Sequence, residues 1–176
     1  MKRSNIWYLA REGFSFDGFD GSATAVKIAA ERLNLEIPDW RERGSFQVGD
    51  LANLPYRDNT FDAVIDVEAI CCNGWDESRV IICEIARVLK PQGKLFSQTF
   101  SLESFGARSG KLAGRNAWIS EAGGFANKGL TRFTAFEEIP DLYQEFNIAE
   151  LEVTTRTSNG RKDEIKEWII VGEKHG

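Results

Sequence analysis

The sequence has few of the residues that build disulfide-linked or metal-bound proteins. Its three cysteines are an odd number without the spacing of a zinc site, which argues against a disulfide framework and a structural zinc ion. His175 is the only histidine, which argues against a Ser-His or Cys-His catalytic pair and against a histidine-ligated metal. We therefore expect no metal site.

Long apolar segments are also absent. No run of about 18 apolar residues is present, and the N-terminus lacks the apolar stretch of a signal peptide. We expect a cytoplasmic protein without a membrane segment.

The composition is that of a globular chain with a slight excess of negative charge. Of the 176 residues, 42% are hydrophobic, and 12 Phe and 5 Trp supply large apolar side chains. A chain of this length buries roughly 70% of its extended surface, so we expect one core and a single domain over residues 1–176. The net charge of −5 argues against a nucleic-acid partner.

The adjacent cysteines Cys71 and Cys72 have two interpretations. They could form a redox-active pair, or they could be small buried residues beside a strand end. We favour the second interpretation because free cysteine is among the most often buried residue types.

Strand and helix patterns alternate along the first hundred residues. We predict helices over 5–12, 22–34 and 76–89, and strands over 14–19, 46–48, 61–67 and 94–100. The run from Phe61 to Val67 is almost continuously apolar, as in strands buried on both faces. This order predicts a Rossmann-like α/β fold in three layers, with a mostly parallel sheet between helices.

The remainder of the chain has a different character. Residues 102–133 are rich in glycine and carry five basic against two acidic side chains, which predicts a long loop acting as a substrate-side flap. A solvated loop explains the same charges equally well. A helix is predicted over 134–146, and an antiparallel hairpin over 149–172 with its turn at Asn159 and Gly160.

Two carboxylates follow neighbouring predicted strands. Asp20 ends the strand of residues 14–19, and Asp50 comes directly after that of residues 46–48. Ligands of parallel sheets bind at the carboxyl ends of strands, where such carboxylates accept ribose hydroxyls and an adenine amino group. Gly21 and Ser22 add backbone amides at a position of close approach. The pair predicts a nucleoside cofactor.

A longer pattern carries a family resemblance. The segment Gly49–Asp62, followed by Arg87–Phe96 with its Leu-Lys-Pro-Gln-Gly turn, resembles the class I S-adenosylmethionine-dependent methyltransferases. The resemblance extends over about residues 5–100. More loosely, residues 129–174 resemble a bacterial subgroup that acts on small molecules.

The resemblance implies a cofactor and its contacts. S-adenosylmethionine would be the methyl donor and S-adenosylhomocysteine the product. Asp20 would bind the ribose, Asp50 and Leu51 would flank the adenine, and Asp66 and Val67 would lie near the methionine portion.

One part of the family's pattern is missing. The family's first strand and its glycine-rich turn precede the first helix, whereas residues 1–10 of this sequence already resemble that helix. Without a central strand, the strands over 14–19 and 61–67 would each have an unpaired edge. We therefore expect a homo-oligomer that associates through sheet edges.

Candidate catalytic groups lie at the end of the strand over 61–67. Glu68 is the first choice for a general base and Asp66 the second. Both could instead form hydrogen bonds that cap the next helix. Methyl transfer can also proceed by alignment alone, without a base.

The predicted function is methyl transfer from S-adenosylmethionine to a small-molecule acceptor, without a nucleic-acid or membrane partner. The alternative is a non-catalytic relic or partner subunit of the same fold.

A nicotinamide-dependent dehydrogenase would leave Asp50 and the Leu89–Gly93 turn unexplained. The segment Gly106–Leu112 resembles a phosphate-binding loop, but its two glycines are one residue too close together, which argues against a nucleotide triphosphatase.

Overall fold

The computed structural model describes residues 5–176 and divides them into two compact units. The N-terminal unit ends at Leu54, and the C-terminal unit runs from Pro55 to Gly176. The predicted resemblance of residues 1–10 to the family's first helix falls, for residues 1–4, outside the described part of the chain. The expectation of a single domain over residues 1–176 stays a prediction.

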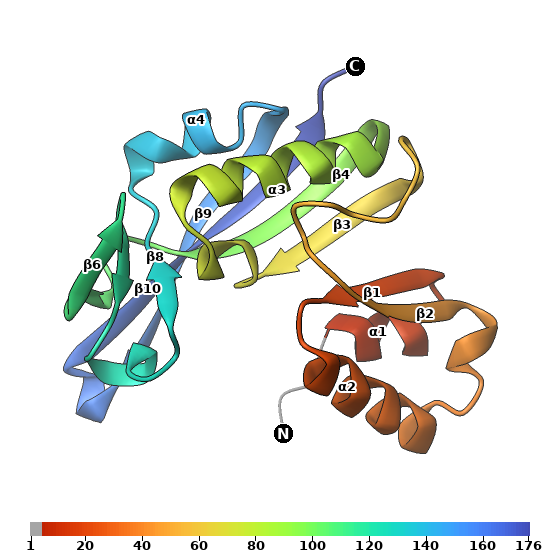
Figure 1. Ribbon diagram of the computed structural model, residues 1–176, viewed down its shortest axis with the longest axis horizontal. Helices are drawn as coiled ribbons and strands as arrows, with labels where there is room; N and C mark the ends of the chain where they lie inside the picture. Colours follow the sequence, from red (N-terminus) through yellow and green to blue (C-terminus); the bar gives the residue numbers. More distant parts are fainter. Residues whose placement is uncertain (1–4) are drawn as a thin grey trace. The chain divides into compact units, whose positions relative to one another are not determined.

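The N-terminal unit contains a two-stranded parallel sheet and two α-helices (Figure 1). Its elements are α1 (Asn5–Arg11), β1 (Phe16–Asp20), α2 (Ala23–Glu36), the 3-10 helix η1 (Trp40–Glu42) and β2 (Gly44–Val48). The sequence prediction is confirmed here, including the start of α2, where Ser22 Oγ accepts a hydrogen bond from Ala25 N at 3.2 Å. Trp7, Phe16 and Trp40 form the core of this unit.

The C-terminal unit is built on a four-stranded mixed sheet with strand order β3-β4-β10-β9. Its elements are β3 (Phe61–Val67), η2 (Ile70–Cys72), α3 (Trp75–Val88), β4 (Leu89–Phe100), β5 (Phe105–Arg108), β6 (Lys111–Gly114), β7 (Ala117–Ile119), η3 (Gly123–Phe125), β8 (Leu130–Arg132), η4 (Phe136–Glu138), α4 (Ile139–Leu142), β9 (Phe146–Ser158), η5 (Asn159–Arg161) and β10 (Asp163–Lys174). β3 and β4 are parallel, whereas β10 is antiparallel to both β4 and β9. The predicted C-terminal hairpin is therefore confirmed.

The segment over residues 102–133 is not the structureless loop that the sequence predicted. It contains β5 and a three-stranded antiparallel sheet with order β6-β7-β8. These strands are only three or four residues long, too short for an alternating pattern to stand out. Phe125 and Phe133 hold the segment to the main sheet by packing against Phe100.

The predicted helix over 134–146 is also wrong in length. Only η4 and the single turn of α4 form, and β9 begins at Phe146. The capping contact comes from Glu138, whose Oε2 accepts a hydrogen bond from Ala135 N at 3.1 Å. The helical stretch ends at Leu142, residues 143–145 form a turn, and β9 then pairs with β10 over 12 registered positions.

The strand β3 is less buried than its apolar sequence indicated. Ile65 and Val67 expose 44% and 39% of their surface, and only Asp66 in this strand is buried. β3 is the end strand of the four-stranded sheet, with a hydrogen-bonded neighbour on one side among the described strands. The expectation of burial on both faces was therefore wrong, because the face that carries Ile65 and Val67 stays exposed.

Among residues 5–176, no helix is long and apolar enough to cross a membrane.

Candidate functional site

The structure brings Asp20 and Asp50 to the same end of the N-terminal sheet. Asp20 ends β1 in register with Val48, the last residue of β2. Gly49 N donates a hydrogen bond to the carbonyl oxygen of Asp20 at 3.2 Å, and Asp50 follows directly. Both carboxylates are exposed. The sequence prediction that they lie at neighbouring strand ends is correct.

Each of these carboxylates uses one oxygen to hold its own loop. Asp20 Oδ1 accepts a hydrogen bond from Ser22 N at 2.7 Å, and Asp50 Oδ1 accepts one from Ala52 N at 2.9 Å. The Oδ2 atoms accept no hydrogen bond from the described residues. Because an ionised carboxylate has about four acceptor positions, each side chain can still bind hydroxyl or amino groups of a ligand.

The residues around Asp20 leave room for a ligand. A methyl group built on Gly21 would meet only Gly49 O, at the ordinary contact distance of 3.7 Å. Ser22 organises the loop rather than facing a ligand with its hydroxyl, because its Oγ caps α2. Leu51, the predicted adenine neighbour, is half-buried beside Asp50.

Asp66 is the buried acid of the C-terminal unit. Its Oδ2 accepts a hydrogen bond from Ser97 Oγ at 2.8 Å, and its Oδ1 accepts bonds from Ala69 N and Ile70 N at 3.1 and 3.2 Å. Burial raises the pKa of Asp66 above its ordinary value, and these hydrogen bonds oppose the increase. Both oxygens therefore hold the strand end and the start of η2.

Glu68 has an unusual backbone conformation directly after β3. Its φ angle of 61° lies in the left-handed region, which costs a residue other than glycine on the order of 1 kcal/mol. Its N donates to Gln98 O at 2.9 Å, and its carbonyl oxygen lies 3.3 Å from both Cys71 Sγ and Cys72 Sγ. Cys71 is buried and Cys72 exposed, and both are free thiols.

Sequence reasoning missed a buried polar cluster around Arg132. This guanidinium is fully buried, and it donates to Ser78 Oγ at 3.2 Å and to Thr134 Oγ1 at 2.9 Å. Burial lowers the pKa of Arg132, and the hydroxyl of Tyr143 lies 2.9 Å from Ser97 Oγ in the same interior. Burial also raises the pKa of Tyr143. No local motif marks these residues, because they come together only through tertiary packing.

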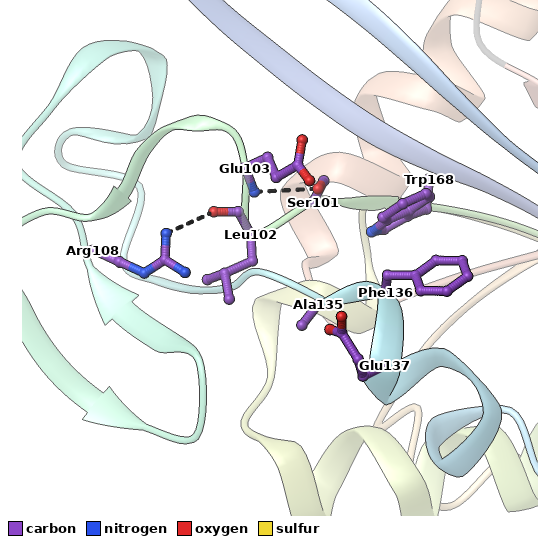
Figure 2. Close-up of a pocket in the computed structure, with 8 residues that line it drawn as sticks. All are labelled: Ser101, Leu102, Glu103, Arg108, Ala135, Phe136, Glu137 and Trp168. Atoms are coloured by element: carbon purple, nitrogen blue, oxygen red, sulfur yellow. Dashed lines mark hydrogen bonds between the residues drawn. The ribbon is translucent and has the colours of Figure 1, made fainter.

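A cavity of about 160 Å³ lies in the C-terminal unit beyond the end of β4 (Figure 2). Ser101, Leu102, Glu103 and Arg108 line one side, and Ala135, Phe136, Glu137 and Trp168 line the other. Figure 2 shows that the rings of Phe136 and Trp168 lie next to each other. The sequence analysis assigned none of these residues to a binding site, although Leu102, Glu103 and Arg108 lie in the predicted substrate-side flap.

The predicted site residues therefore form two groups in two units. Asp20, Asp50 and their neighbours share one strand end, whereas Asp66, Val67 and Glu68 share another. Within the described range 5–176, no group of three or more His, Cys, Asp or Glu side chains is placed to hold a metal ion.

Comparison of the chain with known proteins identifies a family. Residues 4–97 match the methyltransferase domain family, which is more than half of the chain. Phthiotriol/phenolphthiotriol dimycocerosates methyltransferase 1 from Mycobacterium ulcerans is 36% identical over 81 residues, covering 46% of this chain and 27% of that protein. Demethylmenaquinone methyltransferase from Thermotoga maritima is 36% identical over 78 residues, covering 44% of this chain and 30% of that protein. The chain thus matches less than a third of the length of these curated relatives.

Solved structures share the fold at low sequence identity. A SAM-dependent methyltransferase from Methanosarcina mazei has a TM-score of 0.74 at 19% identity, covering 96% of this chain and 85% of that one. The [4+2]-cyclase SpnF has a TM-score of 0.69 at 19% identity, covering 96% of this chain and 70% of that one. The fold is therefore shared with proteins of more than one activity, and the family match is the more specific finding. The chain belongs to the methyltransferase domain family and shares the fold of S-adenosylmethionine-dependent methyltransferases.

Proposed function

We propose that this protein transfers a methyl group from S-adenosylmethionine to a small-molecule acceptor. The observation that carries the proposal is the pair of exposed carboxylates, Asp20 and Asp50, at adjacent strand ends of the matched region. The relatives from Mycobacterium ulcerans and Thermotoga maritima are methyltransferases by name, which supports the same reaction type.

The N-terminal unit fits the nucleoside half of this cofactor. Asp20 Oδ2 would accept the ribose hydroxyls, and Asp50 with Leu51 would flank the adenine. The open side of Gly21 would allow close approach, and Ser22 would keep the Asp20 carboxylate in place through its backbone N–H. When bound, S-adenosylmethionine supplies a methyl group activated by its positively charged sulfur.

In the C-terminal unit, Asp66 and Val67 would act near the methionine portion. Because both oxygens of Asp66 already accept hydrogen bonds inside the unit, we assign Asp66 to fixing the strand end that carries Val67 and Glu68. Val67 is part-exposed and would supply apolar contact.

Glu68 is our first candidate for a general base, since it follows the carboxyl end of β3. Its left-handed backbone supports this role, because strained residues concentrate at functional sites. Asp66 is the second candidate, and a third possibility is transfer by alignment alone.

The remaining assignments are proposals of the same kind. The protein would act in the cytoplasm as a single domain, and residues 102–133 would cover the acceptor. The side of β3 that has no hydrogen-bonded neighbour among the described strands would support a homo-oligomer. A non-catalytic relic of the fold is less favoured, because the two exposed carboxylates keep free acceptor positions.

The acceptor class is tested by incubating the protein with methyl-labelled S-adenosylmethionine and a deproteinised, nuclease-treated cell extract. We expect label in a low-molecular-weight product that chromatography separates from the labelled S-adenosylmethionine, and an Asp20→Asn variant should lose most of this product. Glu31→Gln, an exposed change on α2, is the matched control and should leave the label unchanged. In parallel reactions with added intact nucleic acid or protein, label found only in these polymers and in no small-molecule product would contradict the proposal.

A further inference from the structure

The cavity beyond β4 lies at an end of the sheet where ligands of parallel strands bind. Ser101 directly follows β4. Trp168, on β10, is the cross-strand neighbour of Thr99 on β4. β3 and β4 are parallel, so their carboxyl ends lie at the same edge. This position favours a cavity that binds part of the substrate over a cavity that only results from packing.

One wall of the cavity is aromatic and held in a fixed orientation. The ring centroids of Phe136 and Trp168 are 5.8 Å apart with an interplanar angle of 46°. Trp168 Nε1 donates to Thr134 O at 2.9 Å, which fixes the indole ring. Phe136 nevertheless exposes 58% of its surface. An exposed aromatic face next to a fixed indole is a surface that attracts cations.

On the aromatic side of the cavity, the charged residue that lines the wall is Glu137. Glu103 is neutralised by Lys166, whose Nζ lies 2.9 Å from Glu103 Oε2. Arg108 donates only one long hydrogen bond, at 3.4 Å, to Leu102 O. Glu137 has no hydrogen bond or ion pair among the described residues, and Figure 2 shows its side chain beside Phe136 with Arg108 on the opposite side of Leu102. A positive group on the aromatic wall would therefore gain an ionic partner.

The size of the cavity limits the ligand to one compact head group. Its volume of about 160 Å³ is close to that of an engineered protein cavity of ~150 Å³ that binds benzene. We propose that this cavity binds the alkylammonium group of the methyl acceptor, against the faces of Phe136 and Trp168 and beside the carboxylate of Glu137. The proposal rests on the proposed methyltransferase function, because it assigns this group to the acceptor.

The experiment compares choline with its neutral isostere 3,3-dimethylbutan-1-ol by titration of the intact protein. Because a cation over an aromatic face and beside a carboxylate gains stabilisation that a neutral group lacks, we expect choline to bind about tenfold more tightly. Glu137→Gln should reduce choline affinity several-fold and leave the isostere nearly unchanged, whereas Phe136→Ala should weaken the binding of both, and of choline more. Both positions are exposed, so both variants are expected to fold.

Glu150→Gln, an exposed carboxylate on β9, is the matched control and should bind choline as the unchanged protein does. Equal affinity for choline and the neutral isostere would overturn the proposal, and so would full choline affinity in Glu137→Gln. A parallel titration with S-adenosylhomocysteine separates the two proposals. Cofactor binding without choline binding rejects only the cation site, whereas choline binding without cofactor binding rejects its role as an acceptor site.

Discussion

Asp66 and Ser97 are register partners across the parallel strands β3 and β4, and a hydrogen bond of 2.8 Å joins their side chains inside the C-terminal unit. The bond continues to Tyr143, whose hydroxyl lies 2.9 Å from Ser97 Oγ. This buried chain of polar groups fixes the strand end directly before Glu68. The pKa of Asp66 consequently links the stability of the fold to pH.

Asp66→Asn should gain stability relative to the unchanged protein as the pH rises. Burial raises the pKa of folded Asp66 above its ordinary value of 3.8, so its contribution to stability is fully present below that value and is lost as pH rises through the raised pKa. The variant stays neutral throughout, and its advantage should grow by on the order of 1 kcal/mol. Arg132, Tyr143 and Cys71 face the same carboxyl group and titrate at much higher pH. Urea unfolding at about pH 4 and pH 7 measures the difference; a difference that is flat or falls with pH would contradict the burial argument.

Arg132→Ala should destabilise the C-terminal unit by about 3 kcal/mol, because it leaves the hydroxyls of Ser78 and Thr134 without their donor and opens a cavity. Arg132→Met fills most of the space without a buried charge and should cost considerably less. Urea unfolding of both variants tests the assignment. Equal losses in the two variants would show that the hydrogen bonds of the guanidinium, and not the volume of the side chain, dominate at this position.

Glu68→Gly should be more stable than Glu68→Ala by about 1 kcal/mol, because glycine adopts the φ angle of 61° without strain. The alanine variant is the control, since both substitutions remove the same carboxylate. Thermal unfolding compares the two. If Glu68 is the general base, both variants should also lose methyl transfer to a similar degree. A glycine variant no more stable than the alanine variant would contradict the strain at this position.

Ile65→Lys should weaken self-association. β3 has a hydrogen-bonded neighbour on one side among the described strands, and Ile65 exposes 44% of its surface there. A lysine on an exposed edge strand opposes pairing with a second copy. Size-exclusion chromatography with light scattering over a concentration series should give a dimer for the unchanged protein and more monomer for the variant. A clean monomer of the unchanged protein at high concentration would reject association through this edge.

The fold was predictable where the sequence pattern spans whole elements. The helices α2 and α3 carry an N-cap or a clear stop at Pro91, and the hairpin carries its Asn159-Gly160 turn. The small sheet over residues 111–132 was not predictable, because its strands are too short to show a period. The helix after Thr134 was overestimated because local capping chemistry does not reveal that the chain turns at residues 143–145, before β9 begins at Phe146.

The candidate site was predictable for the same reason. Asp20 and Asp50 each follow a strand, and strand ends can be read from the sequence. By contrast, Arg132 and Tyr143 come together only through packing between distant segments. The aromatic wall of the cavity likewise consists of Phe136 from η4 and Trp168 from β10, which are far apart in the sequence. Contacts of this kind leave no local pattern in the chain.

The central claim is that the two exposed carboxylates bind the nucleoside of S-adenosylmethionine. Isothermal titration with S-adenosylhomocysteine tests it most directly, in the unchanged protein and in Asp20→Asn and Asp50→Asn, with Glu31→Gln as the control. Each lost hydrogen bond to a charged acceptor is worth about 1.5–3 kcal/mol, so each Asp variant should bind roughly tenfold or more weakly, and the control should bind unchanged. The absence of heat up to millimolar ligand, or full affinity in both Asp variants, would contradict the account.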